Sequence, residues 1–361
     1  LFTHEYDSKN TYIKNTWNSF MLGITKCNVA LQYLTKLEQT EEVKNYVNET
    51  LFIRALCMYH LMDCFGHFPM REYTETDYSK LPVILEREQA LNRIITELET
   101  IIPQLKEKGE VPYGRITKAA AQLLLAKVYL NYQVYTGTAP TFADGQSKWT
   151  ETIDLCDDII GSGKYTLSTD FWKLYLADNQ KESDATETIL PIIFNNAIGL
   201  KGIPWLNITL HYNQKFGSFT SIWNGCCTTP TFLATWDTTD PRYQDNRLKS
   251  QIGFNLGILV GQQYSANGSE LLTRSGSKLI FTPEFSVQNS TEAQGARVVK
   301  YAPDPTSTYG SNSENDFQYY RLADVYLMRA EAKFRSGDVD GALTDINELR
   351  NKRHVNTYKK E

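Results

Sequence analysis

The residues best suited to binding chemistry lie in one short stretch near the middle of the chain. Residues 202–225 read GIPWLNITLHYNQKFGSFTSIWNG and combine large rings with amides, namely Trp205, His211, Tyr212, Asn213, Phe216, Trp223 and Asn224. A sugar presents apolar C–H faces ringed by hydroxyl groups. It is therefore held by an exposed aromatic ring with amide, carboxylate or guanidinium groups at its edge. This stretch has both kinds of group.

The same rings could instead bury one another as a small core beneath the loops, and for any single ring the two interpretations are equally weighted. For the group we expect some exposure, because loops without long apolar runs seldom bury so many large rings. We therefore place a binding surface between about residues 203 and 247. The predicted ligand-binding residues are Trp205, Tyr212 and Trp223 as stacking plates, with Asn213, Asn224 and Arg242 as hydrogen-bonding partners.

No pattern in the sequence indicates catalysis. The chain lacks GxSxG, a Walker loop, GxGxxG after a strand, and HExxH. Asp237 and Asp240 could serve as a glycosidase pair, but two acids beside a proline in TWDTTDPRYQD are far more often turn formers. We expect a protein that is not an enzyme, with no catalytic residue, no cofactor and no metal ion.

The six cysteines show no CxxC pair and no spacing with histidine that would suit a zinc site. Cys57 and Cys64 are seven residues apart, which places them on one helical face and predicts core packing. The sequence leaves open whether the adjacent Cys226 and Cys227 are paired.

The 361 residues carry 37 Lys and Arg against 42 Asp and Glu, with both signs mixed along the chain. That distribution argues against nucleic acid as a partner, because no basic patch is available for a phosphate backbone. Apolar runs stay shorter than the roughly 20 residues that a membrane-spanning helix needs. With 41% hydrophobic residues, the chain can form a sizeable core.

The elements that would position these residues are mostly helices. Apolar residues at steps of three and four predict helices at about residues 17–31, 51–65, 88–105, 118–132 and 148–160. From Phe317 the helical pattern returns. Gly337 then ends one helix and Asp338 caps another, so the two form a hairpin of the tetratricopeptide type.

Between these helical parts, residues 188 to about 300 hold short β-prone pieces among Gly, Asn, Ser and Thr. We predict a mainly α fold, a tetratricopeptide-like helical-repeat scaffold with a long irregular insertion carrying short strands. The predicted divisions of this single domain (residues 1–361) are a helical scaffold at 12–187, an irregular ligand-facing insertion at 188–316 and a C-terminal hairpin at 317–352. Long irregular segments in compact proteins are usually functional surface.

Five segments together resemble one family, the SusD/RagB nutrient-uptake lipoproteins of the Bacteroidetes outer membrane. These segments are WNSFMLGITKCNVALQYL, IRALCMYHLMDCFGHFPM, YGRITKAAAQLLLAKVYLNY, WNGCCTTPTF and YYRLADVYLMRAEAKFRSGDVDGALTDINELR. They follow the order that the family has and span nearly the whole chain. Each alone is weak, but the five in order are specific.

The resemblance implies non-catalytic binding of an oligosaccharide or polysaccharide at the cell surface, and its delivery to a SusC-like TonB-dependent transporter. It implies a lipid anchor in the outer membrane, attached upstream of this chain, which we expect to be a fragment. It also implies that part of the sugar site comes from before the first helix, with His4, Tyr6, Asp7, Asn10 and Tyr12 as its remnant. The alternative is a lid that captures peptides or only closes the transporter, without a sugar site.

Overall fold

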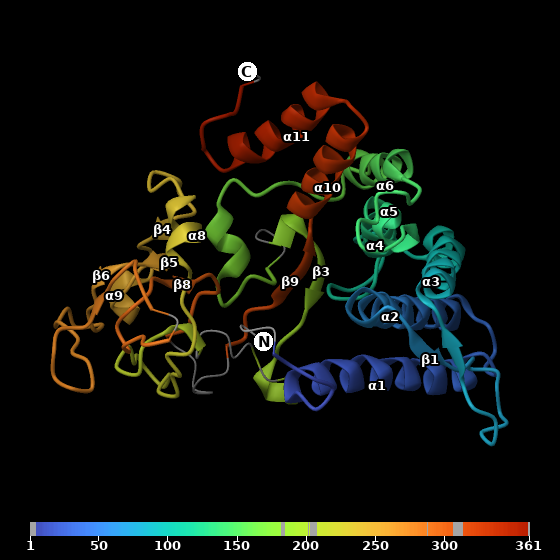
Figure 1. Cartoon of the computed structure of the whole chain (residues 1–361), viewed down its shortest axis with the longest axis horizontal. Coiled ribbons are helices and arrows are strands. Elements are labelled where there is room, and N and C mark those ends of the chain that lie inside the picture. Colours follow the sequence, from blue (N-terminus) through green and yellow to red (C-terminus); the bar gives the residue numbers. More distant parts are fainter. Residues whose placement is uncertain are drawn as a thin grey trace. The chain divides into compact units, whose positions relative to one another are not determined.

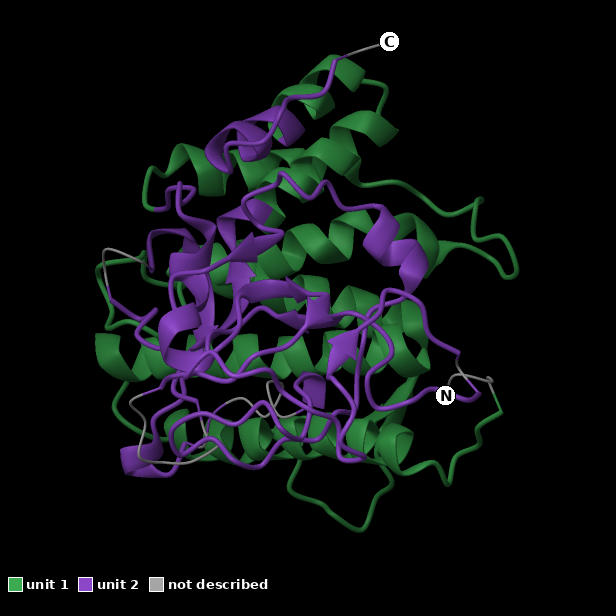
Figure 2. Cartoon of the chain, turned by 90° about the vertical axis from the view of Figure 1, so that its left-hand side faces the viewer, with its two compact units in different colours: residues 1–164, 324–345 green, residues 165–323, 346–361 purple. Residues whose placement is uncertain are grey.

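The computed structural model describes residues 5–181, 185–200, 202, 208–286, 288–305 and 313–359. Figure 1 shows the whole chain. The chain divides into two compact units, which Figure 2 shows in different colours. Unit 1 comprises residues 1–164 and 324–345, and unit 2 comprises residues 165–323 and 346–361.

Unit 1 is built mainly from helices. Its elements in chain order are α1 (Thr11–Leu34), α2 (Glu41–Phe65), β1 (Phe68–Met70), β2 (Val83–Leu85), α3 (Arg87–Ile101), the 3₁₀-helix η1 (Ile102–Gln104), α4 (Lys118–Leu130), α5 (Tyr132–Thr136) and α6 (Trp149–Gly161), followed by residues 324–345 of α10 (Leu322–Arg335) and α11 (Val339–Lys352). Helix α1 packs on α2, α2 on α3, α3 on α4, and α4 on α6. Among the residues that the structure covers, no helix is both long and apolar enough to span a membrane.

Short polar side chains fix where these helices begin. Asn10 accepts hydrogen bonds from the backbone N–H groups of Tyr12 and Ile13, and Thr40 accepts one from Val43. These bonds satisfy donors that the first turn of a helix leaves unpaired. At its other end α2 stops at Gly66, whose φ of 79° is a conformation that glycine adopts without strain.

A buried ion pair joins the first three helices of unit 1. The Arg54 side chain of α2 is 1% exposed, and its Nε donates to Glu97 Oε1 of α3 at 2.9 Å. Arg54 Nη1 also donates to Asn28 Oδ1 of α1 at 2.9 Å. A buried guanidinium without such partners would be strongly unfavourable, so these contacts constrain how α1, α2 and α3 pack.

The last two helices form the hairpin that the sequence predicts. Gly337 has a φ of 93°, and Asp338 Oδ1 accepts the Gly341 N–H at 2.9 Å, so they act as the terminator and the cap. Arg329 and Lys333 of α10 both contact the buried Asp345 carboxylate of α11. These ion pairs hold the two helices antiparallel.

Unit 2 consists of short strands and 3₁₀ turns joined by long loops. Its elements are η2 (Phe171–Tyr175), η3 (Ala185–Glu187), β3 (Thr188–Ile192), η4 (Asn196–Ile198), α8 (Pro230–Ala234), β4 (Gln244–Asp245), α9 (Lys249–Ile252), β5 (Leu256–Leu259), β6 (Gly261–Gln262), β7 (Ile280–Phe281), β8 (Arg297–Val299) and β9 (Phe317–Arg321). The described strands of this unit pair antiparallel: β3 with β9, β4 with β5, β5 with β8, and β6 with β7.

These short strands surround a hydrophobic core of their own. The core contains Trp172, Leu210, Phe216, Phe219, Ile222, Ile252, Phe254, Leu256, Leu259, Leu279, Phe281, Val299 and Ala302. The rings of Phe216 and Phe219 stack with centroids 4.9 Å apart. Trp172 Nε1 donates to the Pro241 carbonyl at 2.9 Å, so the one polar atom of this buried ring is satisfied.

The prediction of a mainly α fold with a strand-bearing irregular part is confirmed, but some details differ. Helix α2 begins at Glu41 rather than near Leu51, because its first ten residues, EEVKNYVNET, are too polar to show the apolar period. Residues 317–321 form strand β9 rather than the start of a helix. Cys64 is exposed, so the prediction that it packs in the core is wrong.

Candidate glycan-binding site

The central loop of unit 2 is closed by backbone hydrogen bonds between its two ends. Asn224 N–H donates to the Leu210 carbonyl at 2.9 Å, and Cys226 N–H donates to the Ile208 carbonyl at 3.0 Å. Between these ends, Phe216, Phe219 and Ile222 are buried in the core. These buried side chains therefore anchor the loop to the hydrophobic core of unit 2.

The predicted rings have different surroundings. Trp223 is 54% exposed, whereas Phe216 is only 4% exposed. Tyr212 is half-buried, with the Arg274 guanidinium 4.3 Å from its ring centre. Trp205 lies outside the described residues, as does His4. Trp223 is thus the predicted stacking ring that the structure places in solvent.

The predicted polar partners are engaged with the protein itself. Asn213 Nδ2 donates to the Leu272 carbonyl at 2.7 Å. Asn224 Nδ2 donates to the Glu292 carbonyl at 3.0 Å, and its Oδ1 accepts from Arg297 Nη2 at 2.9 Å. These amides hold the loop against residues far along the chain, and their roles as ligand partners stay predictions.

Arg242 is occupied in a similar way. Its Nε and Nη2 atoms donate to Asp240 Oδ1 and Oδ2 at 2.9 and 2.6 Å, and its guanidinium is 5.9 Å from the Trp236 ring centre. None of the contacts described for Arg242 joins it to Tyr212, Asn213, Trp223 or Asn224. Its predicted role in ligand binding also stays a prediction.

A pocket of about 620 Å³ lies beside the contacts of Asn213 and Asn224. Its lining residues are Thr273, Arg274, Ser275, Ser277, Lys278, Thr291, Glu292 and Ala293. Sequence reasoning missed these residues, because the pocket forms only when segment 273–278 meets segment 291–293. The local pattern TRSGSK offered polar turn chemistry but no ring and no catalytic spacing.

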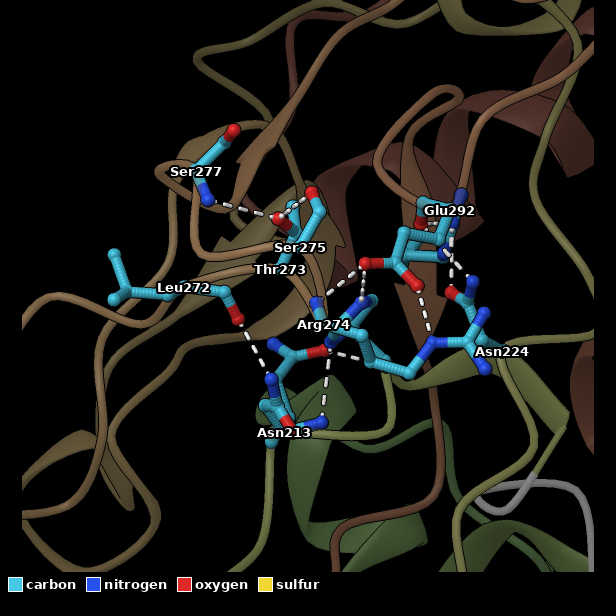
Figure 3. Close-up of polar contacts among 11 residues, drawn as sticks. Asn213, Asn224, Leu272, Thr273, Arg274, Ser275, Ser277 and Glu292 are labelled. Carbon is cyan, nitrogen blue, oxygen red and sulfur yellow. Dashed lines mark hydrogen bonds and ion pairs between the residues drawn. The ribbon is translucent and has the colours of Figure 1, made fainter.

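Glu292 is the most connected side chain of this pocket (Figure 3). Its Oε1 accepts the Arg274 backbone N–H and its Oε2 accepts Arg274 Nε–H, each at 2.6 Å. Burial by itself would raise the pKa of the Glu292 carboxyl, but the hydrogen bonds from the Arg274 side chain and backbone, together with the Arg274 charge, lower it overall. Glu292 is therefore an ionised acceptor that orients Arg274.

His211 supports the pocket from within the protein. Its side chain is fully buried, and its Nδ1 accepts the Asn213 N–H at 3.1 Å. Burial lowers the pKa of His211, so the ring is neutral near pH 7 and its remaining hydrogen is on Nε2. Nε2 lies 3.6 Å from Glu292 Oε1. His211 thus positions Asn213 by a hydrogen bond and lies close to the Glu292 carboxylate without a hydrogen bond to it.

Unit 1 has a pocket of a different kind. It measures about 280 Å³ and lies along α1, with Met21, Ile24, Val29, Pro69 and Pro82 among its lining residues. Polar residues line it as well, namely Thr25, Asn28, Gln32, Arg71, Glu72 and Tyr78. Within the described parts of the chain, no group of three or more His, Cys, Asp or Glu side chains could hold a metal ion.

Comparison with known families identifies the chain. Residues 1–130 match a family model described as "Starch-binding associating with outer membrane". Residues 125–361 match the model of the SusD family. The chain belongs to the SusD family. The resemblance noted in the sequence is thereby confirmed, and the helical scaffold is of the tetratricopeptide-like kind expected for a member.

Named relatives give the extent of the similarity. The starch-binding protein SusD of Bacteroides thetaiotaomicron is 27% identical over 93% of this chain, which spans only 63% of the length of SusD. A SusD superfamily structure from Parabacteroides distasonis superposes with a TM-score of 0.73 at 22% identity, over 98% of this chain and 70% of the other. Surface glycan-binding protein A from Bacteroides uniformis gives 0.68 at 18%, over 95% and 67%. At these identities the two structures establish the fold alone.

Proposed function

We propose that this protein binds an oligosaccharide or polysaccharide without changing it chemically and delivers it to a SusC-like TonB-dependent transporter. The observation that carries the proposal is the surface of unit 2, where the exposed Trp223 adjoins Asn224, whose side chain is bonded to the wall of the Glu292 pocket. An exposed ring next to a hydroxyl- and charge-lined pocket suits the mixed surface of a sugar.

The relatives support this ligand class. One curated relative is named a starch-binding protein, and one solved structure is named a surface glycan-binding protein. The family description that matches residues 1–130 also mentions association with the outer membrane. We propose the same location for this protein, exposed at the cell surface through a lipid anchor. Residues 188–316 would face the ligand.

The two acids that could serve as a glycosidase pair, Asp237 and Asp240, have surroundings that favour binding without catalysis. A glycosidase needs one carboxylic acid whose pKa is raised so that it can donate a proton. The side-chain and backbone hydrogen bonds from Thr239 lower the pKa of Asp237. Burial favours a raised pKa for Asp240, but its hydrogen bonds to Arg242 lower the pKa overall. Neither acid suits that role.

Calorimetric titration with a panel of glycans and of peptides tests the proposal. We expect a glycan to bind with a Kd of roughly micromolar or weaker, because a shallow surface buries little area. Product analysis after long incubation with that glycan should show an unchanged chain length. Binding of peptides with no glycan bound would replace the proposal with the peptide-capturing lid. Depolymerisation that is lost in Asp237→Asn or Asp240→Asn would make the protein an enzyme.

A further inference from the structure

The Glu292 pocket, to whose wall Asn224 is bonded, has an unusual balance of hydrogen-bonding groups. Its polar lining groups that can donate are the Arg274 guanidinium, the Lys278 ammonium and the hydroxyls of Thr273, Ser275, Ser277 and Thr291. Glu292 is the one carboxylate among these lining residues, and both of its oxygens already accept from Arg274. The charged groups that remain for a ligand are therefore two cations, and the hydroxyls beside them can donate as well as accept.

Arg274 is held in place from two sides. Its Nε and backbone N–H are bonded to Glu292, and its guanidinium is 4.3 Å from the centre of the Tyr212 ring. These contacts leave the terminal Nη1 and Nη2 atoms without a partner among the described residues. The side chain is 64% exposed. A guanidinium fixed at its Nε and free at both Nη atoms is ready to bind a planar or tetrahedral anion.

Lys278 adds a second positive charge to the same wall. Its Nζ lies 3.0 Å from Glu270 Oε1, and its side chain is 60% exposed. This exposed pair contributes little to stability and can rearrange when a ligand arrives. The turn that carries both cations is ordered by Thr273, whose Oγ1 accepts the Ser277 N–H at 3.1 Å and lies 3.0 Å from Ser275 Oγ.

From these contacts we propose that the pocket binds a saccharide bearing an anionic substituent, a carboxylate or a sulfate group, with Arg274 as its direct partner and Lys278 as a second cation. The inference rests on the proposed function and specifies its ligand class. Trp223 would contact the sugar ring, and Arg274 would select the charged group.

Matched pairs of probes test the inference. One pair is an oligogalacturonate and the galactose oligosaccharide obtained by reducing its carboxylates to CH₂OH. The other is a sulfated galactan oligosaccharide and its desulfated form. We expect the charged member of at least one pair to bind about tenfold or more tightly than the neutral member, because charge-assisted hydrogen bonds are the stronger kind. The pair that discriminates identifies carboxylate or sulfate as the group bound.

Substitutions then assign the discrimination to the pocket. In Arg274→Gln the ratio of the two affinities should fall close to one, and in Arg274→Lys it should recover in part. Lys278→Gln should lower the ratio less. The matched control is Arg335→Gln, which removes another exposed arginine paired with a glutamate, on α10. Thermal unfolding of each variant shows whether the wall stays folded. If Arg274→Gln unfolds, two other measurements test the inference. A lower affinity ratio in Lys278→Gln and at higher salt would support it, and a ratio unchanged in both would overturn it.

The possible results separate the two proposals. Equal or tighter binding of the neutral members would overturn the inference and leave glycan binding intact. The same holds if Arg274→Gln keeps the discrimination in a folded protein. If neither member of any pair binds, and the wider glycan panel is also silent, the proposed function and the inference both fail.

Discussion

Trp223 offers the sharpest test of where a sugar would bind. The change is Trp223→Ala, which removes the most exposed of the described rings in the predicted surface. A tryptophan has about 150–250 Å² to bury, and with 54% exposure roughly 100 Å² of Trp223 remains available to a ligand. A sugar ring stacked on one face would cover about half of that area.

The size of the effect follows from that area. At about 25 cal/mol per Å², covering roughly 50 Å² contributes about 1.3 kcal/mol, which is a tenfold change in Kd. The buried part of the ring also amounts to roughly 100 Å², so the free energy of unfolding should fall by no more than about 2.5 kcal/mol. A core tryptophan replaced by alanine would instead cost about 3–5 kcal/mol.

The assay is calorimetric titration of wild type and Trp223→Ala with the same glycan, accompanied by urea unfolding. Phe334→Ala is a suitable control, because Phe334 is 63% exposed but lies on α10 in unit 1. We expect about tenfold weaker binding for Trp223→Ala and unchanged binding for Phe334→Ala. Unchanged affinity in the Trp223 variant would refute the stacking role. A loss of 3 kcal/mol or more in stability would mean that the ring is part of the core.

Two further predictions concern buried ionisable side chains of unit 2. The fully buried Glu187 accepts from Arg321 at 2.7 Å and from Arg353 at 2.6 Å, so these ion pairs should stabilise unit 2. Glu187→Gln should lower the free energy of unfolding by about 3 kcal/mol in urea titration. A loss below about 1 kcal/mol would contradict this stabilising role. Burial lowers the pKa of His211 in the folded protein below its unfolded value of about 6.5. The neutral His211 ring therefore contributes its full stability above that unfolded pKa, and this contribution is lost as the pH falls through the lower folded pKa. Thermal unfolding from pH 7.5 to 5 should therefore show a decline that is smaller in His211→Gln, and equal declines would refute this.

The helices were predictable because their residues repeat a local rule. Helix α6 (Trp149–Gly161) matches the expected 148–160 within one residue, and the hairpin follows the order Gly337 then Asp338. In α2 the apolar period starts late although the helix does not, so its first ten residues were missed. Strand β9 was missed because the sequence that follows Phe317 soon takes up a helical period.

The binding surface was only partly predictable, for a physical reason. Trp223 and Phe216 are both large rings in one loop, but their exposures of 54% and 4% depend on which side of the loop faces the core. The Glu292 pocket needs contacts between segments that are distant in sequence, as Arg274 with Glu292 shows. Residue type and spacing indicate the chemistry available, whereas tertiary contacts decide which groups remain free for a ligand.

The central claim is that the loops of unit 2 hold a glycan, and hydrogen exchange of the backbone amides with and without a bound glycan tests it most directly. The account predicts slower exchange in three segments when the glycan is present, residues 208–224, 272–278 and 291–293. Slower exchange confined to the helices of unit 1, with those three segments unaffected, would contradict it.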